Sequence, residues 1–330
     1  MDNIIAKINS VKRLDIGCFP TPIHRMNNVE KELCQGQGQV FIKRDDLTGI
    51  GPGGNKIRFL EYILQDAKQK DSDVVLVSGP VQSNLCTATA CVCRKINMEC
   101  IAVFNGEKPK ELKGNFLLDE IIDSKSHYIG DVTEEERNVY VEDLSKLLKS
   151  HGKKPYIIRY GGSTGLGAMG YVNAILELVE QCESQKIKID EIFAPGANGG
   201  VAAGLIYGNA ILGFPFKINI ISVEYDTSLL KKNIIKIINE LEILTGIKFN
   251  YNLEEACKIF DEFRGNGWGY RTEKSENLVY EFPKMEGIFI ENIYTSKVLV
   301  GMLELIKNKK VNGNACFIHT GGFVSLFGQI

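Results

Sequence analysis

Gly53-Gly54-Asn55-Lys56 is the stretch of this 330-residue sequence that says most about its fold and its chemistry. It follows the polar run Lys43-Arg44-Asp45-Asp46-Leu47-Thr48-Gly49 and leads into an apolar, helix-like pattern. A lysine at such a turn can be shielded from water, which lowers the pKa of its amine and lets it form a Schiff base with an aldehyde. Lys56 is therefore a candidate to bind a carbonyl cofactor, pyridoxal phosphate first of all. A single lysine at a helix start is, however, more often an ordinary surface residue.

The composition is that of a globular protein with one large or two smaller domains, since 44% of the residues are hydrophobic and 24% are charged. A formal net charge of -2 does not provide the excess of positive charge that is typical of proteins that bind nucleic acid. No apolar run reaches the ~20 residues that cross a bilayer, and residues 1–20 lack the order of a signal peptide. We expect a cytoplasmic protein that binds neither nucleic acid nor membrane.

The nine cysteines are odd in number and scattered through apolar segments, which favours reduced thiols over a disulfide framework. Cys91-Val92-Cys93 has no second cysteine pair and no histidine cluster to accompany it. We therefore expect no metal site.

Strand-like and helix-like patterns alternate from residue 74 onward. Short β-branched runs predict strands, and the longer segments between them predict helices, an alternation typical of parallel sheets with helices on both faces. The expected strands are 74–78, 101–104, 156–158, 191–194, 218–223 and 315–319. The expected helices are 83–95, 114–122, 133–150, 166–182, 201–212 and 228–244.

Four further segments carry polar residues or glycines where strands end, which is where parallel sheets bind ligands. Gln82-Ser83-Asn84 opens a helix and could receive a carboxylate, or could simply cap the helix. Pro195-Gly196-Ala197-Asn198-Gly199-Gly200 suits a phosphate, although tight turns need glycine in any case. The other two are Glu286-Gly287-Ile288 with Tyr294-Thr295, and His319-Thr320-Gly321-Gly322. Either of these two segments could also consist of ordinary core residues with no role in binding.

Taken together and in this order, the segments resemble the D-cysteine desulfhydrase / 1-aminocyclopropane-1-carboxylate deaminase family. The resemblance extends from about Asp15 to the C-terminus, and the blocks have the family's spacing as well as its residue types. Its further blocks are Phe19-Pro20-Thr21-Pro22, Gly114-Asn115-Phe116-Leu117-Leu118-Asp119, Gly161-Gly162-Ser163, Leu166-Gly167-Ala168-Met169-Gly170-Tyr171 and Phe317-Ile318-His319-Thr320-Gly321-Gly322.

The resemblance implies the fold type II architecture of pyridoxal-phosphate enzymes. This is an α/β fold with two open, twisted, mainly parallel sheets flanked by helices, usually in a homodimer. Residues 1–50 and 165–330 would form a large cofactor-binding domain. Residues 51–164 would form a small domain that carries the Schiff-base lysine and the Ser-Asn loop.

The resemblance also implies a role for each site residue. Lys56 would form the Schiff base and remove the Cα proton, Ser83 would contact the substrate carboxylate or assist proton transfer, and Tyr294 would donate to a leaving group. Asn84 would bond to the cofactor's 3′-oxygen, and Thr295 would contact its pyridine nitrogen. The other expected cofactor contacts are Gly196, Ala197, Asn198, Gly199, Gly200 and Thr320. The expected substrate contacts are Gln82, Ser83, Asn84, Trp268 and Tyr294.

The position of Thr295 bears on the reaction. In the cyclopropane deaminases it is a glutamate, which keeps the pyridine nitrogen protonated and the ring a strong electron sink. A threonine hydroxyl cannot hold that charge, and β-elimination needs less carbanion stabilisation than opening a cyclopropane. We therefore predict a lyase that carries out α,β-elimination on a small amino acid, releasing ammonia and a 2-oxo acid. The alternatives are β-replacement, racemisation or a specialised biosynthetic step, and last a non-catalytic binding protein.

The sequence departs from the family's pattern where phosphate and substrate would bind. The phosphate loop, usually Thr-Gly-Ser-Gly-Gly-Thr, here runs from Gly196 to Val201, and the family's phosphate-binding lysine is Phe59. The usual His-x-Arg is Leu85-Cys86-Thr87, and the second active-site tyrosine is Trp268. The absence of one charge-assisted hydrogen bond to the phosphate would weaken cofactor binding by ~1.5–3 kcal/mol.

Overall fold

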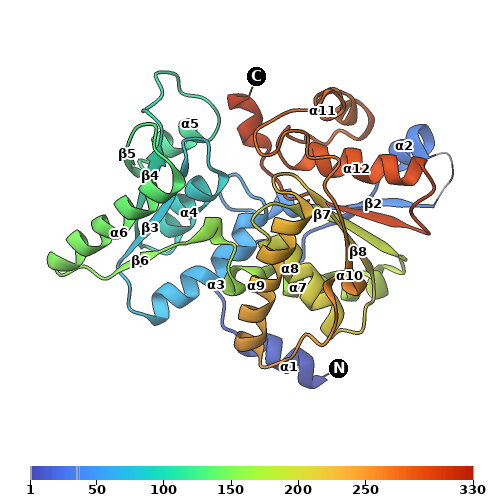
Figure 1. The fold of residues 1–330 in the computed structure, drawn as a ribbon, viewed down its shortest axis with the longest axis horizontal. Coiled ribbons are helices and arrows are strands. Elements are labelled where there is room, and N and C mark those ends of the chain that lie inside the picture. Colours follow the sequence, from blue (N-terminus) through green and yellow to red (C-terminus); the bar gives the residue numbers. More distant parts are fainter. Residues whose placement is uncertain (1, 35, 37, 330) are drawn as a thin grey trace.

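The computed structural model describes residues 2–34, 36 and 38–329, and its strands form two sheets that lie side by side (Figure 1). The large sheet has the spatial order β1 (Ile23–Arg25), β2 (Val40–Lys43), β10 (Ala315–Ile318), β7 (Glu191–Gly196), β8 (Lys217–Ser222), β9 (Cys257–Phe260). The small sheet has the order β5 (Lys125–Tyr128), β4 (Glu99–Asn105), β3 (Val74–Pro80), β6 (Pro155–Ile157). All neighbouring strands are parallel except β1 and β2. The predicted fold class is confirmed.

Helices cover both sheets. In Figure 1, α4, α5 and α6 lie around the small sheet, whereas α11 and α12 lie on one side of the large sheet and α7, α8 and α9 on the other. The longer helices are α1 (Asp2–Ser10), α3 (Asn55–Gln69), α4 (Asn84–Lys95), α5 (Gly114–Ile121), α6 (Glu134–Ser150), α7 (Gly165–Gln185), α8 (Gly200–Ile211), α9 (Thr227–Thr245), α11 (Glu273–Glu286) and α12 (Thr295–Lys307). The short ones are α2 (Asn27–Val29) and α10 (Leu253–Ala256). None of the described helices is long and apolar enough to cross a membrane.

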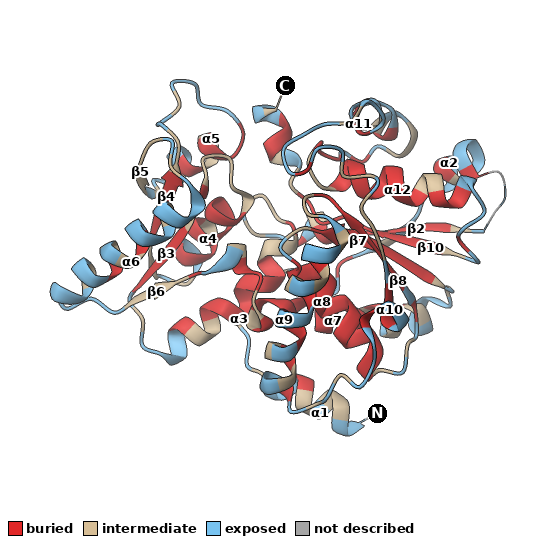
Figure 2. Ribbon diagram, viewed as in Figure 1, coloured by how far each residue is buried: buried red, intermediate tan, exposed pale blue. Residues whose placement is uncertain are grey.

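Every strand and helix expected from the pattern is present, with ends that differ by at most three residues. The central strands and α8 are almost wholly buried (Figure 2), as their continuous apolar runs require. The pattern missed the strands β1, β2, β5 and β9, and it gave no prediction for helices α1, α2, α10, α11 and α12. Lys125–Tyr128 contains no β-branched residue, and β5 and β9 each have a neighbouring strand on one side only.

The strands of the small sheet come from residues 74–157, and those of the large sheet come from both sides of this segment. Helix α3 lies between the two groups and packs against both α4 and α7. The domain boundaries near residues 50 and 165 stay a prediction.

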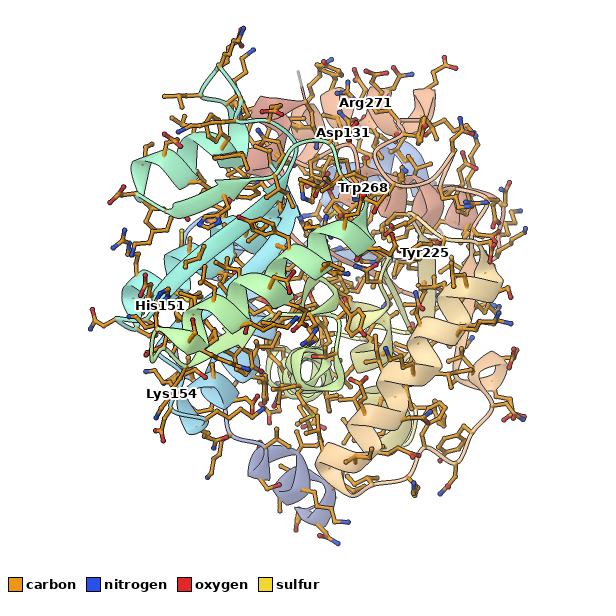
Figure 3. All side chains as sticks on the ribbon, turned by 60° about the vertical axis from the view of Figure 1, so that its left-hand side comes forward. Asp131, His151, Lys154, Tyr225, Trp268 and Arg271 are labelled. Carbon is orange, nitrogen blue, oxygen red and sulfur yellow. The ribbon has the colours of Figure 1, made fainter. Side chains whose placement is uncertain are left out.

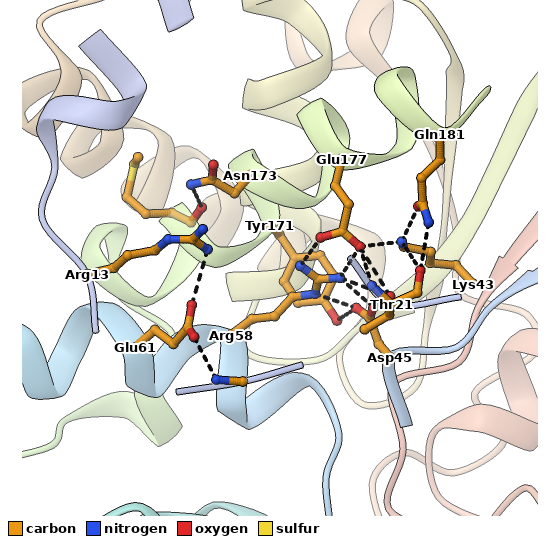
Figure 4. A network of polar contacts seen from close by, with 12 residues as sticks. Arg13, Thr21, Lys43, Asp45, Arg58, Glu61, Tyr171, Asn173, Glu177 and Gln181 are labelled. Carbon is orange, nitrogen blue, oxygen red and sulfur yellow. Dashed lines mark hydrogen bonds and ion pairs between the residues drawn. The ribbon is translucent and has the colours of Figure 1, made fainter. Parts of the chain in front are cut away.

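A buried ion cluster joins β2, α3 and α7 (Figure 4). Arg58 of α3 donates to Asp45 at 2.7 Å and to Glu177 of α7 at 2.9 Å, and Lys43 of β2 also pairs with Glu177. Tyr171 donates to Asp45 at 2.8 Å. Two cations thus face two carboxylates, so the cluster is neutral and its charges are compensated inside the protein.

The cluster shifts the pKa values of its carboxyl groups. Burial alone would raise the pKa of Asp45 and of Glu177, but the charges of Arg58 and Lys43 outweigh it and both pKa values are lowered. A lowered carboxyl pKa contributes stability that is present above the ordinary carboxyl range and is lost as the pH falls through the lowered value.

We expect Glu177→Gln to lower the free energy of unfolding by about 3–5 kcal/mol, because it leaves an unbalanced positive charge in a buried cluster. Urea denaturation at neutral pH measures this. Glu180→Gln, on the exposed face of the same helix, is the matched control and should change little. Equal stability of the two variants would contradict the role given to the cluster.

Candidate active site

The start of α3 and the end of β10 meet through two glycines. The Asn55 N–H donates to the Thr320 carbonyl at 2.9 Å. A Cβ on Gly54 would lie 2.8 Å from that carbonyl oxygen, and a Cβ on Gly321 would lie 2.6 Å from the Gly54 Cα. Both glycines also have positive φ, so a side chain at either position would force the two segments apart. The Gly53-Gly54-Asn55-Lys56 turn therefore sits against the Thr320 loop.

Lys56 follows this contact directly. Its side chain is partly exposed, yet protein surrounds it closely enough that burial lowers the pKa of the amine to about 8. The Nζ lies 5.1 Å from the centroid of the Phe59 ring. Within the described residues the Nζ has no hydrogen bond or ion pair. An amine with a lowered pKa and no competing partner can act as a nucleophile or a base.

The Gln82-Ser83-Asn84 segment opens α4, as predicted, and Ser83 is the N-cap. The Ser83 hydroxyl accepts from the Cys86 N–H at 3.3 Å. Asn115 of α5 holds both neighbours, because its side chain donates to Asn84 Oδ1 at 2.6 Å and its N–H donates to Gln82 Oε1 at 2.8 Å. This bracing by Asn115 was not anticipated from the sequence.

Asn84 also lies beside the end of β10. A Cβ on Gly322 would be 3.1 Å from Asn84 Nδ2 and 3.3 Å from Glu291 Cγ. The structure thus brings the Ser-Asn loop, the Gly321-Gly322 turn and the segment before α12 together.

The glycine loop from Gly196 to Gly200 leads from β7 into α8, and Gly199 at φ 96° is the N-cap. A Cβ on Gly200 would lie 3.0 Å from both the Phe59 ring and the Ser163 hydroxyl, so the loop packs closely on α3. Tyr225 donates to Asn198 Oδ1 at 3.2 Å. The helix N-terminus offers N–H groups to an anion, and an apolar ring stands where the family's lysine would be.

Tyr294 and Thr295 begin α12, and both hydroxyls have protein partners. The Tyr294 oxygen accepts from Trp268 Nε1 at 2.6 Å. Burial raises the pKa of Tyr294, so the hydroxyl stays protonated at neutral pH. Thr295 is fully buried, accepts from the Glu291 N–H at 2.8 Å and lies 3.0 Å from Glu291 Oε1. The only proton of the Thr295 hydroxyl is therefore directed at Glu291, and its oxygen can only accept from a ligand.

His319 is a core histidine, and both of its ring nitrogens have protein partners. Its Nε2 faces the Phe289 carbonyl at 2.8 Å, and its Nδ1 accepts from the Gly321 N–H at 3.2 Å. Burial lowers the pKa of His319, which keeps the ring neutral. It shapes the turn that contacts Gly54.

Most of the predicted site residues thus lie in linked segments at the carboxyl ends of the inner strands β3, β7 and β10, although the role of each one stays a prediction. Two surface hollows of about 430 and 400 Å³ lie elsewhere, one around Cys93 and Arg94 and one around Arg13 and Glu180. Neither is lined by a predicted site residue. Within the described residues no group of histidine, cysteine or acidic side chains could hold a metal ion.

These residues fit pyridoxal phosphate: a partner-free amine for its aldehyde, a glycine-rich helix N-terminus for its phosphate, and Asn84 for its hydroxyl. The sequence model of the pyridoxal-phosphate dependent enzymes matches residues 14–321.

Individual relatives cover nearly the whole chain. A Pyrococcus horikoshii protein, whose name assigns it provisionally to the 1-aminocyclopropane-1-carboxylate deaminases, is 34% identical over 98% of this chain and 96% of its own. The D-cysteine desulfhydrase of Salmonella typhi is 29% identical over 96% of this chain and 95% of its own. A solved structure described as an ACC deaminase homologue is 33% identical, with a TM-score of 0.91 over 99% of this chain and 97% of its own.

These matches confirm the predicted cofactor, fold and enzyme class, and they set aside the non-catalytic reading. The chain belongs to the family of pyridoxal-phosphate dependent enzymes, among the relatives of the ACC deaminase and D-cysteine desulfhydrase type.

Proposed function

We propose that this protein catalyses α,β-elimination on a small amino acid and releases ammonia and a 2-oxo acid. The observation that carries the proposal is Lys56, whose amine has a pKa near 8 and no partner in the described part of the chain. When bound, pyridoxal phosphate supplies an aldehyde and an electron sink. The amine of Lys56 is suited to take the Cα proton, because its pKa is close to neutral.

The residues around Lys56 divide the remaining tasks. Ser83 and Gln82 stand at the N-terminus of α4, where N–H groups and side chains can hold the substrate carboxylate. Tyr294 remains protonated because burial raises its pKa, and its oxygen already accepts from Trp268. Its own O–H therefore remains free to donate to a leaving group, which is the step that elimination requires.

Thr295 supports elimination over ring opening. Its hydroxyl proton is engaged by Glu291, so towards the pyridine nitrogen it offers one acceptor and no charge. Such an acceptor stabilises a protonated nitrogen less than a carboxylate would. The resulting weaker electron sink suits a reaction whose leaving group departs as charge develops at Cα.

The proposal includes a cytoplasmic homodimer, as the family resemblance implies. All nine cysteines are free thiols in the structure, in keeping with a reducing compartment.

The function is tested by the visible absorbance of the purified protein, recorded before and after adding D- and L-cysteine, β-chloroalanine and other small amino acids. A band that changes with one amino acid, together with release of 2-oxo acid, supports elimination. A band that changes without oxo acid favours β-replacement or racemisation. No response to any amino acid would refute the proposal.

Lys56→Ala should abolish the visible band of the cofactor-loaded protein, because it removes the amine that reacts with the aldehyde. Lys68→Ala, on the exposed last turn of the same helix, is the control and should keep the band. A full band in Lys56→Ala would mean that another lysine carries the cofactor.

Thr295→Val should slow exchange of the substrate Cα proton with solvent by about tenfold, the effect of removing one hydrogen bond of ~1.4 kcal/mol from the rate-limiting charge separation. Thr295→Ser keeps the hydroxyl and should retain most of the rate. NMR-detected deuterium exchange compares the three proteins. Equal rates would contradict the proposal that Thr295 affects how well the cofactor ring withdraws electrons.

A further inference from the structure

Lys297, on the first turn of α12, is a buried lysine that the proposed mechanism does not use. Its side chain is fully buried. The Nζ donates to the carbonyl oxygens of Arg264 and Gly267 at 2.8 Å each, and to that of Val223 at 3.3 Å. The three N–H bonds of the ammonium group thus match three main-chain acceptors.

An ammonium group is costly to bury without an ion pair, and none reaches Lys297 among the described residues. Burial accordingly lowers the pKa of Lys297 to about 8, against the opposing charges of Glu291 and Glu224. A methionine of similar length would fill the same space without that cost. The presence of a lysine is therefore better explained by the main-chain segments that it holds in place through these three carbonyl oxygens.

Two of the three acceptors belong to the loop between β9 and α11. This loop contains Gly265, Gly267 and Gly269, all at positive φ, so its own sequence restricts its conformation little. At its two ends the loop is tied by Asp261, which accepts from Thr227, and by Arg271, which donates to the Gln329 carbonyl. Between these ends, Arg264 also donates to the Glu224 carbonyl at 3.3 Å. The Gly267 carbonyl that Lys297 binds directly precedes Trp268.

Trp268 in turn reaches back to the start of α12, where its Nε1 donates to the Tyr294 hydroxyl at 2.6 Å. Its side chain is 41% exposed, so burial of the indole alone does not fix its place. Figure 3 shows Trp268 on the same face of the molecule as Tyr225. Tyr294 and Lys297, three residues apart, thus hold the side chain of Trp268 and the main chain beside it.

We propose that Lys297 is a positioning residue: it anchors the Arg264–Gly267 main chain so that the Trp268 indole donates to Tyr294 and directs the Tyr294 proton to the substrate. The direction follows because an oxygen that accepts from the indole turns its own O–H elsewhere. The part that concerns substrate rests on the proposed function. The part that concerns the loop does not.

Trp268 is the only tryptophan of the chain, so its fluorescence reports this loop alone. In cofactor-free protein we expect Lys297→Met to shift the emission to longer wavelength and to increase quenching by acrylamide, because the freed indole meets more water. Lys307→Met, on the exposed last turn of the same helix, is the matched control and should leave both unchanged. Unchanged emission and quenching in Lys297→Met would overturn the proposal.

Should Lys297→Met fail to fold, Lys297→Gln takes its place, since it keeps an NH₂ donor on a shorter side chain. The same shift is expected, and its absence has the same meaning. Circular dichroism of each variant checks that the fold is intact before the fluorescence is compared.

Kinetics test the second half of the proposal in the cofactor-loaded enzyme. Lys297→Met and Trp268→Phe should each lower kcat about tenfold and change KM less, as expected when the proton donor to the leaving group is misdirected. The double variant should resemble either single one, because both act through one hydrogen bond. Additive effects would overturn the link to Tyr294.

A fluorescence shift in a protein that turns over no amino acid would refute the proposed function. It would not contradict the proposal that Lys297 anchors the loop.

Discussion

The bridge that Arg58 makes between Asp45 and Glu177 fixes the frame in which the site is built. Arg58 and Asp45 are buried and Glu177 is nearly so, which means that the pairs can be satisfied only when the segment after β2, the start of α3 and the middle of α7 lie in one arrangement. Lys56 is two residues before Arg58. The Gly54–Gly321 contact holds the turn from the other side. The amine is therefore placed by rigid structure on both sides of it, although it makes no polar bond of its own among the described residues.

The groups around Lys56 are mostly uncharged. Asn115 orients Asn84 and Gln82, Tyr225 orients Asn198, and Trp268 orients Tyr294. In each case an uncharged group, which is the main-chain N–H of Asn115 for Gln82 and a side chain for the others, directs a side chain through a hydrogen bond. Such pairing limits the conformations of side chains that would contact a ligand, which lowers the entropy cost of binding.

Much of this could be predicted from the sequence, because the signals are local. β-Branched runs marked the buried strands β3, β4, β7, β8 and β10 but not β2, the Ser83 cap marked α4, and the Gly-Gly-Asn-Lys turn marked Lys56. The bracing residues could not be found in the same way. Asn115 and Asn84 are 31 residues apart, and Lys297 and Gly267 are 30 apart, so their contacts depend on the assembled fold. Glu291 and Thr295 are only four apart, but a glutamate there does not match a common helix-capping pattern.

The position of β10 has a consequence for how the chain folds. This strand lies between β2 and β7, and its residues pair with residues of β2 that come some 275 positions earlier. The first two strands therefore cannot join the large sheet until almost the whole chain has left the ribosome. The small sheet is one continuous segment and can form during synthesis. Because late, non-local pairing is slow and leaves strand edges open, refolding should pass through a state with an ordered small sheet and an exposed β7 edge, where association with other chains competes with completion of the site.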